Sequence, residues 1–259
     1  MSVSAVMNSS LSLKNTLESL AHRYPAPLVK GQLEDIPRIA FHIELVANLT
    51  GRTAPTIVDV GGGIGLFTPG CAALGMATTL VDDFGDTVNL SDSGTSALAL
   101  HRDLGVIIES RDVMAGLTFP ADHFDAITCF ESMEHWHHSP KKLFHDLIKS
   151  LKPGGIFILS APNCVNLRKR ITVPLGYGKW SPIDLWYGHA VFRGHVREAD
   201  VQDLRYIGTD LGLKNVQILG RNWAGARRPI IRHILPLVDR LLELRPSLCS
   251  NIYLIGRKG

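Results

Sequence analysis

Residues 57–65 form the run Ile57-Val-Asp-Val-Gly-Gly-Gly-Ile-Gly65, in which a short apolar stretch ends in glycines. The apolar half is typical of a buried strand, and the glycines let the backbone turn sharply so that a ligand can approach main-chain amides. A dinucleotide fingerprint would need glycine at position 66, where the chain has Leu66, and no Gly-Lys-Ser/Thr of a Walker phosphate loop follows. The run therefore predicts a ligand-binding turn between a strand and a helix, and it disfavours NAD.

Outward from this turn, apolar runs of strand length alternate with segments of helical period. Strands separated by helices of this length need right-handed crossovers in a parallel sheet. We therefore predict a doubly wound, Rossmann-like α/β fold with a mostly parallel seven-stranded sheet and helices on both faces. The expected strands are 56–60, 77–81, 105–109, 123–130, 156–159, 215–219 and 251–255; the expected helices are 35–49, 66–74, 96–104, 141–151 (ended by Lys152-Pro-Gly-Gly155) and 198–211.

Changes in composition and in hydrophobic periodicity divide the chain into four parts. Residues 1–50 are expected to be an N-terminal helical extension, irregular over 1–33, and residues 51–161 the ligand-binding core. Residues 162–197 begin with a stretch rich in Pro, Gly, aromatic and Arg residues without a steady period, and a loop of this length is usually a lid or a binding segment. Residues 198–259 are expected to complete the same α/β domain.

Composition sets broad limits on the class of protein. With 259 residues, 45% of them apolar and 20% charged, the chain is globular rather than disordered. Its four cysteines include no C-x-x-C pair, so neither a zinc ribbon nor a disulfide framework is indicated. Without a leader pattern or an apolar run of membrane-spanning length, we expect a cytoplasmic protein, at most peripheral to a membrane.

Besides the glycine turn, several further motifs follow one another along the chain. The turn itself is Asp59-x-Gly61-x-Gly63-x-Gly65; the others are Asp82 after the second strand, with Asp83 as the alternative; Asp112 after the third; Phe124-Asp125 to Glu134-His135 around the fourth; and Leu151-Lys-Pro-Gly-Gly155 with Ser160-Ala-Pro-Asn163 around the fifth. A later segment, His195-Val-Arg-Glu198, precedes a helix. In this order, over about residues 55–220, the motifs resemble those of class I S-adenosylmethionine-dependent methyltransferases.

The resemblance implies S-adenosylmethionine as cofactor and assigns roles to the acids. Asp59 would lie near the methionine end, Asp82 would accept both ribose hydroxyls, and Asp112 would accept from the adenine amine. The chemistry agrees, because a sulfonium and an ammonium call for carboxylates. An Asp at a strand end also often caps the next helix, so that role stays open for Asp83. The predicted cofactor-binding residues are Asp59, Gly61, Gly62, Gly63, Gly65, Asp82, Asp83, Asp112, Val113 and Phe130.

The acceptor is expected at the segments after the fourth and fifth strands. Methyl transfer is an in-line displacement, so a base is needed only if the acceptor must lose a proton. His135, in the family's Glu-His pair, is the predicted catalytic residue, with a wall of the site as its alternative role. The predicted substrate-binding residues are Glu131, Glu134, His138, Trp180, Tyr187, His189 and His195.

Mg²⁺ is possible as a further cofactor but is not indicated, and nucleic acid is not expected as a partner. Glu131, Glu134, His135, His137 and His138 include suitable ligands, but three histidines within four residues cannot all point one way, and Mg²⁺ prefers oxygen ligands. The Asn/Asp-Pro-Pro-aromatic motif of base-methylating enzymes is absent after the fourth strand, so no nucleic acid is expected.

Charge divides the chain unevenly. Residues 1–160, with 11 basic and 17 acidic residues, carry −6, whereas residues 161–259, with 16 basic and 7 acidic, carry +9. The three cofactor acids account for part of the first value. In the basic part, a predicted amphipathic helix over 229–244 either packs against the domain or a partner, or, within 227–245, contacts an anionic membrane surface.

The sequence thus predicts a methyltransferase that acts on a small-molecule or glycan-like acceptor at a hydroxyl oxygen. Methylation of a carbon, amine or carboxyl group of a metabolite or lipid is the alternative within the same class. A non-catalytic subunit that binds S-adenosylmethionine is the alternative outside it.

Overall fold

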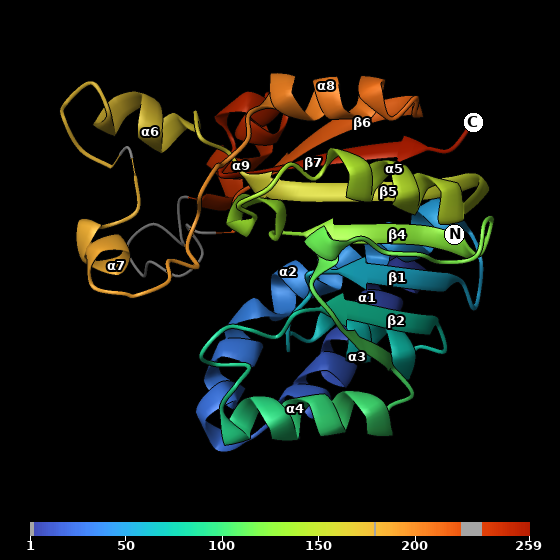
Figure 1. The fold of residues 1–259 in the computed structure, drawn as a ribbon. Coiled ribbons are helices and arrows are strands. Elements are labelled where there is room, and N and C mark those ends of the chain that lie inside the picture. Colours follow the sequence, from blue (N-terminus) through green and yellow to red (C-terminus); the bar gives the residue numbers. More distant parts are fainter. Residues whose placement is uncertain (1–2, 179, 224–234) are drawn as a thin grey trace. The chain divides into compact units, whose positions relative to one another are not determined.

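The computed structural model describes residues 3–178, 180–223 and 235–259, which form two compact units. Unit 1 comprises Met1–Ala115 with His123–Ile127, and unit 2 comprises Gly116–Asp122 with Thr128–Gly259. Within the described part, seven strands are ordered β3-β2-β1-β4-β5-β7-β6, and β4 (Phe124–Phe130) contributes to both units. The predicted α/β fold with a seven-stranded sheet is confirmed (Figure 1).

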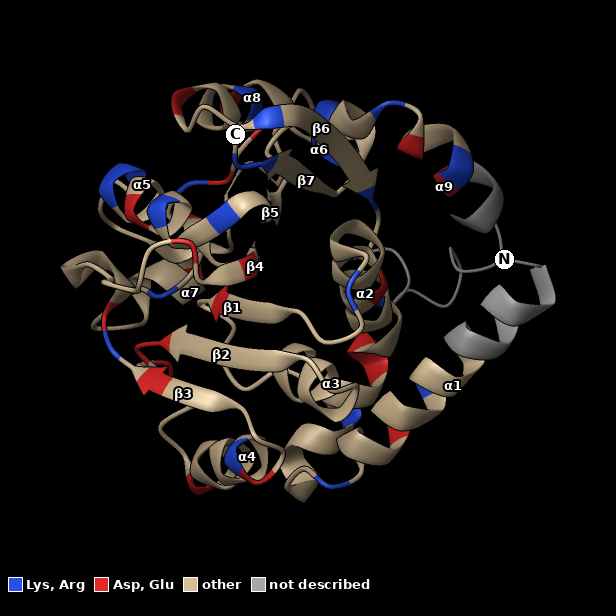
Figure 2. Ribbon diagram, turned by 90° about the vertical axis from the view of Figure 1, so that its right-hand side faces the viewer, with Lys and Arg blue, Asp and Glu red and all other residues tan. Residues whose placement is uncertain are grey.

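Unit 1 is built on three parallel strands. β1 (Thr56–Val60) pairs with β2 (Ala77–Asp82), and β2 pairs with β3 (Ile107–Ser110), with Asp82 opposite Ser110. Because the carboxyl ends of parallel strands share one edge, the segments after these strands meet there. Figure 2 shows acidic residues at the ends of all three strands. The helices of this unit are α1 (Val3–Ala21), α2 (Ala26–Thr50), α3 (Phe67–Ala73), α4 (Asp92–Asp103) and the short η1 (Val113–Ala115).

The N-terminal segment is more regular than predicted. The expectation of an irregular 1–33 was wrong, because α1 and α2 occupy most of it and only a short turn separates them. The apolar positions of α1, spaced among Ser and Asn residues, include the fully buried Leu17. A side chain at Gly70 of α3 would meet Leu17 and Ile43 at 2.8 Å, so this glycine lets α1 and α2 pack closely on α3.

Unit 2 carries the antiparallel part of the sheet. β5 (Leu151–Pro162) and β6 (Lys214–Arg221) both pair antiparallel with β7 (Asn251–Arg257). Phe144 and Phe157, fully or almost fully buried, pack edge to face in its core with ring centroids 5.5 Å apart. Its helices are α5 (Lys141–Ser150), α6 (Leu167–Thr172), α7 (Ile183–Tyr187), α8 (Val201–Asp210) and α9 (Leu235–Glu243), with η2 (Met133–His135) and η3 (Pro246–Leu248).

Two expectations for unit 2 need correction. The strand expected over 156–159 is longer, because β5 begins at Leu151, directly after α5, and so includes Lys152-Pro-Gly-Gly155; Gly154 and Gly155 exchange backbone hydrogen bonds with Lys258 beyond β7. The segment after Pro162 is not without regular structure, since it contains α6 and α7.

The basic amphipathic segment is described only in part. Residues 224–234, with Arg227, Arg228 and Arg232, lie outside the described residues. In α9, Asp239 accepts a hydrogen bond from Asn222 at 3.0 Å and Glu243 pairs with Arg221 at 3.4 Å, so these contacts attach the helix to the end of β6. No helix among the described residues is both long and apolar enough to span a membrane.

Candidate functional site

The glycine turn of unit 1 includes left-handed backbone, which glycine adopts without steric cost. Gly61 and Gly63 adopt φ values of 75° and 56°, a region that side chains rarely occupy. The Gly61 amide donates to the carbonyl oxygen of Val81 at 2.7 Å, which ties the turn to the end of β2.

Asp59 lies directly beneath this turn. Its side chain is almost fully buried, and a Cβ atom at Gly62 would lie 2.0 Å from its Oδ2 atom. Position 62 therefore has to be glycine so that the backbone can pass over the carboxylate.

Asp82 connects β2 to the glycine turn. Its Oδ2 accepts the amide of Gly63 at 3.0 Å, and its Oδ1 accepts the amide of Phe84 at 2.7 Å. Burial raises the pKa of Asp82, although the hydrogen bonds from Phe84 and Gly63 favour its charged form. Each carboxylate oxygen has two lone pairs, so the group can accept further donors.

The alternative acid, Asp83, is placed differently. It is exposed, and its Oδ1 accepts the amide of Gly85 at 2.8 Å within its own turn. Asp82 is therefore the acid of this pair that contacts the glycine turn.

The third predicted acid, Asp112, lies at the same edge of unit 1. The amide of Arg111 donates to the carbonyl oxygen of Asp82 at 3.0 Å, which joins the segment after β3 to the end of β2. Asp112 is exposed and accepts the amide of Met114 at 2.8 Å, while its neighbour Val113 is buried. Nine of the ten predicted cofactor residues thus lie in unit 1, and the tenth, Phe130, lies in unit 2.

Two residues of the N-terminal segment that the sequence did not indicate contact the glycine turn: Tyr24, between α1 and α2, and Gln32, in α2. The Tyr24 hydroxyl donates to the carbonyl oxygen of Gly65 at 3.2 Å, and the Gln32 amide donates to that of Ile64 at 3.4 Å. Both come from the segment predicted to be irregular, and no local pattern marks a contact across so many residues.

In unit 2, hydrogen bonds from β5 and β7 hold the side chain of Glu131. Its Oε1 accepts the Ser160 hydroxyl at 2.8 Å and its Oε2 accepts the Asn251 amide at 2.7 Å, while its own φ is 49°. Such a backbone conformation in a non-glycine residue persists only where the surroundings hold it.

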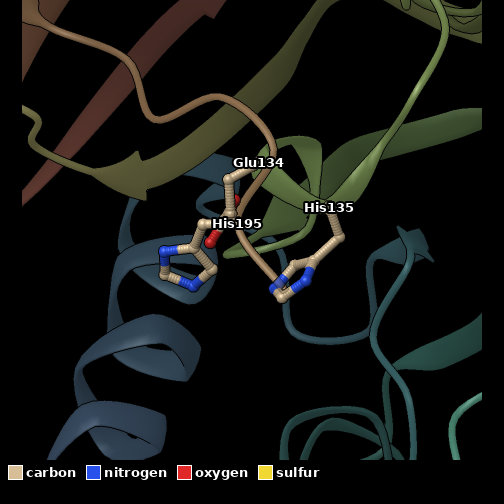
Figure 3. Close-up of side chains that lie close together, drawn as sticks. All are labelled: Glu134, His135 and His195. Carbon is tan, nitrogen blue, oxygen red and sulfur yellow. The ribbon is translucent and has the colours of Figure 1, made fainter. Parts of the chain in front are cut away.

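The structure brings three predicted residues together in unit 2. Ligand atoms of Glu134, His135 and His195 lie within 4.8 Å of one another (Figure 3). Glu134 is buried, whereas both histidines are half-buried. The two imidazole rings are in T-shaped contact, with centroids 5.0 Å apart.

Each of the two imidazoles is oriented by an acceptor. The Nδ1 atom of His135 lies 2.7 Å from the carbonyl oxygen of Arg193, and that of His195 lies 3.0 Å from Oε1 of Glu198. Glu198 also receives a hydrogen bond from Lys169 of α6. Burial opposes ionisation of Glu198, but the hydrogen bonds from His195 and Lys169 outweigh it and lower the pKa of this carboxyl.

The other predicted acceptor residues lie in more open positions. His138 is exposed, and the exposed His189 contacts the carbonyl oxygen of Leu185 through Nδ1 at 3.0 Å. Trp180 and Tyr187 expose 73% and 82% of their surface.

Chemically, the two units offer different functions. The edge of unit 1 combines main-chain amides at a glycine turn with carboxylates after three strands, which suits a cationic ligand that carries hydroxyl and amino donors. The unit 2 cluster offers a carboxylate and two imidazoles, which can bind a metal ion or move a proton.

Comparison with known proteins identifies the family of the chain. Residues 33–218 match a family model described as a methyltransferase domain. The mitochondrial ubiquinone biosynthesis O-methyltransferase of Schizosaccharomyces pombe is 26% identical over 143 residues, which cover 53% of this chain and 49% of that protein. The ubiquinone biosynthesis O-methyltransferase of Alkalilimnicola ehrlichii is 30% identical over 129 residues, covering 49% and 48%. The chain thus spans about half the length of these curated relatives.

A solved structure extends the likeness of fold. Phosphoethanolamine N-methyltransferase 2 of Haemonchus contortus, in complex with S-adenosyl-L-methionine, aligns with a TM-score of 0.55 at 16% identity, covering 84% of this chain and 52% of that one. At this identity the likeness shows a shared fold.

Proposed function

The chain belongs to the methyltransferase-domain family, and we propose that it transfers the methyl group of S-adenosylmethionine to a hydroxyl oxygen of a small-molecule or glycan-like acceptor. S-adenosylmethionine is the methyl donor of this family. The finer parts of the proposal are the acceptor, the methylated atom and the residues that bind each partner.

The observation that carries the cofactor assignment is the contact between Asp82 and the glycine turn. With Oδ2 on the Gly63 amide, the carboxylate is held beside the main chain that approaches the ligand. We assign to it the two ribose hydroxyls, because a carboxylate can accept both and still keep its backbone contacts. The buried Asp59 is assigned to the methionine end and Asp112, with Val113, to the adenine.

The acceptor assignment rests on unit 2. A hydroxyl oxygen attacks the methyl carbon, the bond between that carbon and sulfur breaks, and its electron pair returns to sulfur as S-adenosylhomocysteine forms. The hydroxyl proton must then pass to a base. His135 supports this role, because its Nδ1 faces a carbonyl oxygen that can only accept, so the lone pair of the neutral ring is on Nε2. Both curated relatives are named as O-methyltransferases, which supports an oxygen acceptor.

The experiment is a methyl-transfer screen with labelled S-adenosylmethionine. Phenols, sugars, carboxylic acids and amines serve as acceptors, and the Asp82→Ala variant gives the background. Transfer to hydroxyl compounds that the variant loses supports the proposal. Transfer confined to carbon, amine or carboxyl acceptors would overturn the oxygen assignment, and cofactor binding without any turnover would favour a non-catalytic subunit.

A further inference from the structure

The cluster of Glu134, His135 and His195 is assembled by the backbone of unit 2. The carbonyl oxygen of Glu134 accepts the amides of Val196 at 2.7 Å and of Arg197 at 3.2 Å. These two hydrogen bonds fasten the segment before α8 to η2, so His195 lies against residues that precede it by about 60 positions. At its other end the segment is held to the residues that follow β5, because the Cys164 amide donates to the carbonyl oxygen of Ala199 at 2.9 Å.

The hydrogen bonds of the cluster define which nitrogens carry lone pairs. The carbonyl oxygen of Arg193 can only accept, so His135 carries its hydrogen on Nδ1, 2.7 Å away. His195 donates in the same way from Nδ1 to Glu198, which Lys169 holds from the other side. In both neutral rings the lone pair is therefore on Nε2. Metal-binding histidines in proteins are oriented in this way, by a carboxylate or a carbonyl oxygen at the opposite nitrogen.

We propose that Glu134, His135 and His195 bind a divalent transition metal ion of the zinc class. Two imidazoles and one carboxylate form a mixed nitrogen and oxygen set, which suits these ions better than Mg²⁺ or Ca²⁺. Figure 3 shows the three side chains around one point, and their ligand atoms lie within 4.8 Å of one another. Two ligands about 2.1 Å from a common ion can be no more than about 4.2 Å apart, so small side-chain adjustments bring this set into range.

The proposal differs from the pattern visible in the sequence. The sequence offers several possible metal ligands between positions 131 and 138. Of these, Glu131 already accepts hydrogen bonds from Ser160 and Asn251, and His138 is exposed. His137 contacts the carbonyl oxygen of Phe192 through Nε2 at 3.2 Å, the nitrogen opposite to the one that His135 uses. The structure replaces them with His195, which no local spacing indicates.

Three protein ligands leave open coordination positions on such an ion. Resting on the proposed function, we assign one of these to the acceptor hydroxyl. A metal ion there would lower the pKa of that hydroxyl and strengthen the oxygen as a nucleophile. With the ion bound, Nε2 of His135 is a ligand, so the metal replaces His135 as the activating group and the hydroxyl proton passes to solvent.

The test is metal binding by the full chain, freed of metal with a chelator. Co²⁺ is titrated and followed by its visible absorption, and Zn²⁺ is then added to displace it. We expect one Co²⁺ per chain, no detectable saturation in His195→Ala, and wild-type binding in the control His137→Ala. Glu198→Gln, which keeps an acceptor for His195 but removes the charge that pairs with Lys169, should bind about 10- to 100-fold more weakly. Circular dichroism checks that each variant is folded, which matters most for the buried Glu134→Gln.

Two results would overturn the metal site: a wild-type chain that binds no Co²⁺ or Zn²⁺, or a His195→Ala variant that binds them as tightly as the wild type. A parallel titration with S-adenosylhomocysteine separates this proposal from the proposed function. Binding of S-adenosylhomocysteine without metal binding contradicts only the metal site. Metal binding without methyl transfer contradicts only the proposed function.

Discussion

The hydroxyl oxygen of Tyr24 lies 2.7 Å from Nε2 of the buried His101. The same hydroxyl lies 3.2 Å from the carbonyl oxygen of Gly65, which can only accept. Since a tyrosine hydroxyl has one hydrogen, it donates to Gly65 and accepts from an Nε2–H of His101. A hydrogen-bonded chain thus runs from α4 through the N-terminal turn to the glycine turn.

Removing this hydroxyl is expected to weaken the glycine turn. Tyr24→Phe leaves the buried Nε2–H of His101 without its acceptor, which should lower the free energy of unfolding by about 1–3 kcal/mol. Affinity for S-adenosylhomocysteine should fall as well, because Gly65 loses its tether. Urea denaturation and calorimetric titration measure the two effects. Tyr206→Phe, at an exposed position of α8, is the matched control, and equal stability of the two variants would contradict the chain of hydrogen bonds.

Acid is expected to destabilise unit 1 through His101. Burial, assisted by Arg102, lowers the pKa of this imidazole to about 4 from its usual 6.5. Between these values the unfolded chain binds the proton and the folded chain does not, so stability is lost as the pH falls from 6.5 towards 4, by up to about 3 kcal/mol. Unfolding measured across this range should show a shallower pH dependence in His101→Gln than in the wild type. Identical slopes would show that His101 does not titrate as described.

Two glycines of the turn should respond differently to alanine. At Gly62 the new methyl would lie 2.0 Å from Asp59 and 2.9 Å from Leu80, so Gly62→Ala should destabilise the protein by about 1–3 kcal/mol or more. At Gly65 the nearest atom is 3.7 Å away, so Gly65→Ala should change stability by less than about 0.5 kcal/mol. If the cofactor approaches this backbone as proposed, Gly65→Ala still weakens S-adenosylhomocysteine binding. Thermal unfolding and titration of both variants test this, and full affinity in Gly65→Ala would argue against a close approach.

The strands of the fold could be predicted because they are buried apolar runs bounded by glycines and acids. β1 has the predicted bounds, and β2 extends one residue further, to Asp82. α1 could not be predicted in the same way, since Leu13 and Leu17 lie among serines and asparagines and become a buried face only when α1 meets α2 and α3. β5 was predicted too short because its first residues gain their order from the chain beyond β7.

The candidate cofactor site could be predicted from the sequence more completely than the unit 2 cluster. Acids that follow parallel strands must meet at one edge, so their order along the chain sufficed to bring Asp82 and Asp112 together. The contact between Tyr24 and His101 joins residues 77 positions apart, and that between His135 and His195 depends on two backbone hydrogen bonds to Glu134. Local sequence patterns do not predict contacts between residues so far apart in the chain.

The most direct test of the cofactor site compares Asp82→Ala with Asp83→Ala by calorimetric titration of S-adenosylhomocysteine into the full chain. The account predicts one site per chain in the wild type, unchanged affinity in Asp83→Ala, and at least about 10- to 100-fold weaker binding in Asp82→Ala, because hydrogen bonds to a charged group contribute about 1.5–3 kcal/mol each. Asp82→Asn, which keeps an acceptor for the Gly63 amide, controls for distortion of the turn. Wild-type affinity in Asp82→Ala, or loss of affinity in Asp83→Ala alone, would contradict the account.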